Sequence, residues 1–78
     1  MRIILNAHLK ILRRLAYAGD EGVVASELIP SRVDREQVLG FLSEMGWIAR
    51  QRRFRGERVF ITKKGLLFLE NHGDGYDA

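Results

Sequence analysis

The residues with the clearest chemical potential lie in one short segment, Arg50–Arg58, which reads RQRRFRGER. Five of its nine residues are arginines, and lysine does not occur in it. A guanidinium group is planar, permanently charged and able to bind a phosphate or a guanine edge through two parallel hydrogen bonds. The chemistry that this segment offers is therefore the binding of an anion.

The charge of the whole chain is concentrated around the same segment. The net charge is +3, but residues 47–64 hold seven basic residues and a single acidic one, Glu57. The other sixty residues are acidic on balance, with six basic and nine acidic side chains. Like charges on one short segment repel each other unless a partner neutralises them, so this asymmetry favours a polyanionic partner. A solvated charged surface is the alternative interpretation.

The sequence offers little for catalysis or metal binding. It contains no cysteine, and its two histidines, His8 and His72, have no ligand partners at metal spacing. Neither a glycine-rich phosphate loop nor a nucleophile–base pair is evident, so we expect no enzymatic activity and no metal or cofactor. We find no signal peptide and no apolar run of about 20 residues. We therefore expect a cytoplasmic protein, associated with the nucleoid if the host is prokaryotic.

Several short elements are predicted to precede the arginine-rich segment. Apolar residues at spacings of three and four predict an amphipathic helix over 4–18, and Gly19 would end it. The two valines at 23–24 suggest a short strand. A short helix is expected over 25–29, where Pro30 stops it because the residue before a proline avoids the helical region.

A further helix is predicted over 34–45. Asp34 and Gln37 have the spacing of a capping box, and Gly46 would end the helix. Its two faces differ in composition. The residues expected to be buried are Val38, Phe41, Leu42 and Met45. The residues expected to be exposed are Arg35, Glu36, Leu39, Gly40 and Ser43.

The arginine-rich segment itself is predicted to form a β-hairpin. Its strands would span 47–53 and 58–61, joined by a loop of about four residues, 54–57, with an apolar base and an arginine-rich outer half. Thr62 would cap a last helix over 63–71. We expect one domain over 1–72 and a flexible tail over 73–78. The aromatic residues expected in the core are Phe41, Trp47, Phe60 and Phe68.

Three segments of the chain resemble winged helix-turn-helix domains. Residues 38–50, VLGFLSEMGWIAR, resemble the end of the third helix and the first wing strand of that family. Residues 58–65, RVFITKKG, resemble the second wing strand entering the last helix, and residues 24–28, VASEL, resemble the start of the second helix. The resemblance covers about residues 5–70. It implies an α+β, mostly α fold with a three-helix core, a two-stranded wing and a C-terminal helix, as in small MarR-like or PadR-like regulators and archaeal or viral winged-helix proteins.

The resemblance implies a DNA-binding protein that regulates transcription. The helix over 34–45 would enter the major groove, and the hairpin over 47–61 would lie on the phosphate backbone or in the minor groove. The alternatives are a protein–protein adaptor and a non-specific DNA- or RNA-binding architectural protein. The residues expected to contact DNA are Ser31, Arg32, Arg35, Glu36, Gly40, Ser43, Arg50, Arg52, Arg53, Arg55, Arg58, Lys63 and Lys64.

The first and last helices are richer in apolar residues than a monomer of this size requires. Residues 66–69 are four consecutive apolar residues, and residues 3–5 form another such cluster. Part of this surface would be exposed on an isolated chain. We therefore expect a homodimer that forms through the first and last helices.

Overall fold

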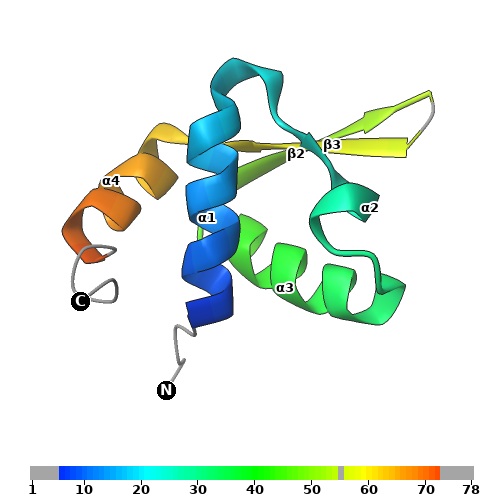
Figure 1. Ribbon diagram of the computed structural model, residues 1–78, viewed down its shortest axis with the longest axis horizontal. Helices are drawn as coiled ribbons and strands as arrows, with labels where there is room; N and C mark the ends of the chain where they lie inside the picture. The colour runs from blue at the N-terminus through cyan, green and yellow to red at the C-terminus, as the bar shows by residue number, and fades with distance from the viewer. Residues whose placement is uncertain (1–5, 55, 73–78) are drawn as a thin grey trace.

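The chain folds into α-helices and a three-stranded antiparallel sheet, in the order expected from the sequence (Figure 1). The computed structural model describes residues 6–54 and 56–72; the expected tail at 73–78, the apolar cluster at 3–5 and Arg55 lie outside the described residues. The predicted α+β, mostly helical class is confirmed. The elements are α1 (Asn6–Ala18), a 3₁₀ turn (Gly19–Glu21), β1 (Val23–Val24), α2 (Ala25–Leu28), α3 (Arg32–Glu44), β2 (Ile48–Arg53), β3 (Gly56–Ile61) and α4 (Lys63–His72).

Helix α3 begins two residues earlier than predicted because Ser31, rather than Asp34, is its N-cap. The backbone of Ser31 is extended, and its side-chain oxygen accepts a hydrogen bond from the backbone N–H of Asp34 at 3.4 Å. This places Asp34 inside the first turn, where its negative charge is stabilised by the positive end of the helix dipole. The prediction that Asp34 caps the helix was wrong, since serine and aspartate cap equally well and two candidates stood three residues apart.

The hairpin formed by β2 and β3, called the hairpin below, has a shorter loop than predicted. Arg52 pairs with Glu57 and Arg53 pairs with Gly56, so only residues 54–55 connect the strands. Gly56 has a φ of +118°, a conformation that side chains disfavour and glycine tolerates. The sequence suggested that glycine marks the loop, whereas it is the first residue of β3.

The expected strand at 23–24 joins the two strands of the hairpin in one three-stranded sheet. The order is β1-β3-β2, and β1 pairs antiparallel with the middle of β3 through Val23 and Val59. Beyond this pairing, the outer half of the hairpin continues with β2 and β3 alone and projects away from the helices (Figure 1). The hairpin is therefore anchored at its base and presented to solvent at its turn.

The core is built mainly from leucines of α1 and α3 packed under the sheet. Leu39 is completely buried, although it was expected on the exposed face of α3. The buried stripe of this helix is centred on Leu39 and Leu42, which leaves Val38 and Phe41 partly buried on its flanks. The predicted stripe was displaced by part of a turn, because apolar residues occupy both flanks. The fully buried large side chains are Leu9, Leu12, Leu15, Leu39, Leu42 and Val59.

Aromatic packing attaches α4 to the start of the hairpin. Trp47 is buried, as predicted, and its ring stacks on that of Phe68 with 3.8 Å between the centroids. Phe41 contacts Trp47 edge-on, with 6.1 Å between the ring centroids. Thr62 caps α4 as expected, accepting from the backbone N–H of Gly65 at 3.0 Å.

None of the described helices has both the length and the apolar character needed to cross a membrane.

Candidate functional site

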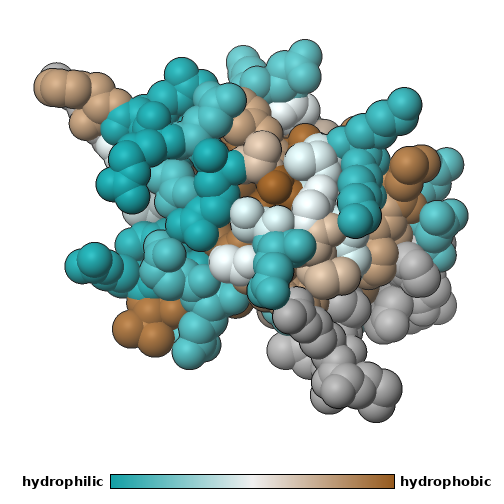
Figure 2. Space-filling view, turned by 180° about the vertical axis from the view of Figure 1, so that it is seen from behind, coloured by the Kyte–Doolittle hydropathy of each residue, from teal (hydrophilic) through white to brown (hydrophobic). Residues whose placement is uncertain are grey.

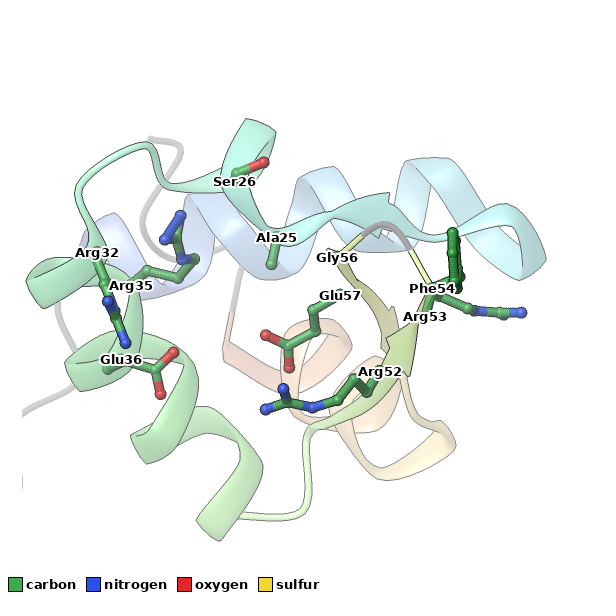
Figure 3. A pocket seen from close by; sticks show the side chains of 10 residues that line it. All are labelled: Ala25, Ser26, Arg32, Arg35, Glu36, Arg52, Arg53, Phe54, Gly56 and Glu57. Atoms are coloured by element: carbon green, nitrogen blue, oxygen red, sulfur yellow. The ribbon is translucent and has the colours of Figure 1, made fainter.

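A groove separates the first turns of α3 from the outer half of the hairpin. Its volume is about 510 Å³, and side chains from three elements line it (Figure 3). Four of the ten lining residues are arginines and two are glutamates, so the walls are positively charged on balance. We call this hollow the groove. Its lining residues are Ala25 and Ser26 from α2, Arg32, Arg35 and Glu36 from α3, and Arg52, Arg53, Phe54, Gly56 and Glu57 from the hairpin region.

Arg50 connects the two walls of the groove through ion pairs. Its guanidinium donates to both carboxylate oxygens of Glu57 on the neighbouring strand, with 3.0 Å between Nη2 and Oε1. The same Nη2 donates to Glu36 of α3, at 3.1 Å from Oε2. The side chains of Arg50 and Glu57 are only 22% and 25% exposed. This network holds the hairpin against α3 and sets the width between them.

The network changes the pKa of Glu57. The hydrogen bond from Arg50 lowers the pKa of Glu57 below its ordinary value, and the nearby positive charges of Arg50 and Arg52 lower it further, against the opposing effect of burial. Glu57 raises the pKa of Arg50 in return, again mainly through the hydrogen bond. The pair is thus ionised throughout the neutral range.

Arg50 and Glu36 therefore have an intramolecular role that was not foreseen. Both were predicted to contact DNA, and Glu57 was not considered a site residue at all. The pairing register was the missing information, since a two-residue loop brings Glu57 opposite Arg52 and diagonal to Arg50. A shorter predicted loop would have placed Glu57 on the groove side of the hairpin.

The hairpin arginines do not share one face, because successive strand residues point to opposite sides of a sheet. Arg50 and Arg52 lie on the side of α3, and the side chain of Arg52 extends toward the groove (Figure 3). Arg53 borders the groove at its outer edge, but its side chain points the other way and donates to Gln51 at 2.7 Å. Arg58 donates to the backbone carbonyl of Glu21 at 2.8 Å, on the far side of the sheet.

The predicted site residues of α3 fall into two groups. Arg32 is exposed and Arg35 half-buried in the groove wall, where Arg35 Nη1 donates to the carbonyl of Ile29 at 3.2 Å. Ser31 immediately precedes them as the N-cap. Gly40 and Ser43 lie farther along α3 and do not line the groove.

The remaining predicted residues are not brought to the groove or are not described. Lys63 and Lys64 are exposed at the start of α4, which follows the base of β3, at the end opposite the hairpin turn. Arg55 lies outside the described residues. Within the described ranges, no group of three or more acidic or histidine side chains could hold a metal ion.

Replacing Glu57 with glutamine is expected to reduce the acid sensitivity of folding. The folded-state pKa of Glu57 is lowered, so its contribution is present above the ordinary value near 4.5 and is lost as the pH falls through the folded-state pKa. At neutral pH we expect Glu57→Gln to lower the free energy of unfolding by about 1 kcal/mol. Urea denaturation between neutral and strongly acidic pH measures both effects.

The matched control for this prediction is Glu70→Gln, at an exposed position on α4. Its stability should follow the pH in parallel with that of the original chain. An equal loss of stability in acid for Glu57→Gln and the original chain would contradict the role assigned to the ion pair.

Comparisons of this chain with protein-family models, with curated proteins and with solved structures give no match.

Proposed function

We propose that this chain is a winged helix-turn-helix protein that binds double-stranded DNA and regulates transcription. In this proposal α2 and α3 form the helix-turn-helix, α3 is the recognition helix and the hairpin is the wing. The observation that carries the proposal is the groove, in which Arg32 from the first turn of α3 and Arg52 from the end of the hairpin lie on opposite walls, while Arg53 borders the outer edge. Two separate elements thus present guanidinium groups to one space.

The spacing of these charges suits a polyanion that is larger than a single phosphate group. Arg32 and Arg52 come from opposite walls, and all three arginines are exposed. A duplex whose major groove receives the start of α3 would bring its phosphate backbone beside the hairpin. Figure 2 shows hydrophilic side chains extending over the hairpin and the neighbouring helices on the rear face of the molecule. An apolar docking groove, which an adaptor would need, is not found at this place.

In this proposal, few residues of α3 remain to read base edges. Leu39 is buried, and Glu36 is held by Arg50. In this proposal Arg32 binds the phosphate backbone, and Arg35, whose guanidinium also donates to the carbonyl of Ile29, is the remaining candidate for a base contact. This small set favours a second candidate function, non-specific binding to duplex DNA, in which backbone contacts supply most of the affinity.

We also propose that the chain forms a homodimer through α1 and α4. Leu66 and Leu67 on α4 are 45% and 51% exposed, and Tyr17 on α1 is 94% exposed. Burial of these side chains against a second copy would remove apolar surface from water. A two-fold dimer would place two copies of α3 on successive turns of one face of the duplex.

A binding titration tests the proposed function. Fluorescence anisotropy with random duplex and with genomic fragments is measured at about 50 mM and about 200 mM salt. Three phosphate contacts predict a slope of about −2.7 for log K against log salt, which is a loss of about 40-fold between these conditions. Tighter binding to particular genomic fragments supports a regulator, and equal binding to all duplexes supports the non-specific candidate.

Affinity that does not depend on salt, or no binding at all, would contradict both candidates. Sedimentation velocity on the same samples reports the mass of the free protein, and a mass of twice the chain supports the dimer. A monomer would count against the paired arrangement of α3 but not against duplex binding by one chain.

A further inference from the structure

The hairpin ends in a completely exposed aromatic side chain. Phe54 directly follows the last residue of β2, and its side chain is 100% exposed. Figure 3 shows it beside Arg53 at the end of the hairpin. In the space-filling view a hydrophobic projection stands beyond the hydrophilic surface at the same end (Figure 2). Folding of the isolated chain gains nothing from this side chain.

The surroundings of Phe54 argue against a protein-docking patch. Single apolar side chains are common on protein surfaces, and a docking site needs several together. The residues that precede Phe54 are Gln51, Arg52 and Arg53, all polar and exposed. An apolar ring beside cationic groups instead matches the chemistry of nucleic acid, in which apolar base faces lie between phosphates.

The geometry of the turn allows a close approach to a large partner. The loop between the paired residues Arg53 and Gly56 has only two residues, so the end of the hairpin is narrow. A Cβ atom built on Gly56 would meet nothing within 4 Å, so the space next to this residue is open. A narrow, projecting end of this kind can enter a minor groove that the body of the protein could not.

We propose that Phe54 inserts as a wedge between two base pairs from the minor groove of the bound duplex. This inference rests on the proposed function and adds a sequence preference to it. While α3 occupies the major groove, Arg52 and Arg53 would hold the adjacent backbone and direct the end of the hairpin into the neighbouring minor groove. Insertion of the ring partly unstacks one base step and bends the duplex.

The proposal identifies the kind of DNA that the protein prefers. Insertion removes the apolar ring from water, which is favourable, but it requires one base-pair step to unstack. The net free energy therefore depends on how easily that base-pair step unstacks. Pyrimidine–purine steps, TA and CA/TG, unstack and kink most easily. The protein should therefore favour sites with such a step at the position of the hairpin, without any hydrogen bond to its bases.

The test compares duplexes rich in TA steps with duplexes of the same composition whose adenines are consecutive. A 2-aminopurine base beside the TA step reports unstacking through its fluorescence. The proteins are the original chain, Phe54→Ala and the control Asp20→Ala, which removes an exposed side chain from the 3₁₀ turn. We expect the original chain and Asp20→Ala to favour TA duplexes and to increase the fluorescence. For Phe54→Ala we expect the preference for TA duplexes to fall about tenfold and the fluorescence change to be lost. The salt dependence of its affinity should stay the same.

The possible outcomes distinguish this inference from the proposed function. If the original chain binds with the expected salt slope but Phe54→Ala keeps the preference and the fluorescence change, the wedge is wrong and duplex binding stands. An equal loss of affinity for both duplexes would also overturn the wedge. If Phe54→Ala lost affinity only for single-stranded DNA, measured in the same way, the wedge would be wrong and Phe54 would contact unpaired bases instead. If the original chain binds no duplex, both proposals are wrong.

Discussion

Replacing Arg32, Arg52 and Arg53 together with alanine is expected to weaken binding to every duplex by about 500-fold at about 0.1 M salt. Each arginine that contacts a phosphate releases counterions, and three lost contacts should reduce the salt slope by about 2.7. All three side chains are exposed, so the variant should fold with unchanged secondary structure. Anisotropy titrations over a range of salt concentrations measure affinity and slope in one experiment.

The control for this variant removes the same charge from a different surface. Lys10, Arg13 and Arg14 on α1 do not line the groove, and their replacement with alanine also lowers the net charge by three. This control should retain most of the affinity. Equal losses for the two triple variants would show that only the overall charge matters, and the groove would then have no special role. Unchanged affinity and slope in the groove variant would overturn the proposed interface.

Replacing Gly65 with alanine is expected to destabilise the fold by about 3 kcal/mol or more. A Cβ at this position would overlap with the backbone carbonyl oxygen of Trp47 and lie 2.9 Å from a side-chain carbon of Ile61. A backbone oxygen cannot move aside without moving the strand, so α4 would have to shift and disturb the stack of Phe68 on Trp47. In a domain of this size, that loss is a large part of the total stability.

The matched control is Gly40→Ala, within α3. A Cβ there would meet no atom within 4 Å, and alanine favours a helix more than glycine does, so we expect a gain of up to about 1 kcal/mol. Urea denaturation monitored by the fluorescence of Trp47, the only tryptophan, measures both variants. Similar unfolding midpoints for Gly65→Ala and Gly40→Ala would show that α4 does not pack as closely on the hairpin as described.

The groove combines a stabilising contact with a binding surface. The ion pairs of Arg50 fix the distance between α3 and the hairpin, and this distance determines where Arg32 and Arg52 stand relative to each other. In the proposed complex, the two arginines would reach phosphates from opposite walls without first reorganising. Acidic residues in a DNA-binding surface are unfavourable when unpaired, but Glu36 and Glu57 are both paired with Arg50, which offsets one of their two negative charges before the duplex arrives.

The sequence alone determined the order and type of the elements in the described part of the chain. The spacing of apolar residues in α1, the two valines of β1 and the glycine that follows α3 are local signals, and the structure confirms them. The concentration of arginine in one hairpin is equally local. Such features depend on a few neighbouring residues, so they can be read without knowledge of the fold.

Only the tertiary structure decided which of these arginines lie together. A hairpin loop shorter by two residues moves Glu57 into pairing with Arg52, and strand alternation then separates Arg52 from Arg53 and Arg58. The burial of Leu39 and the contact of Glu36 with Arg50 depend on how α3 packs against the sheet. Register and packing arise from contacts between distant parts of the chain, where a shift of one residue reverses the face on which a side chain lies.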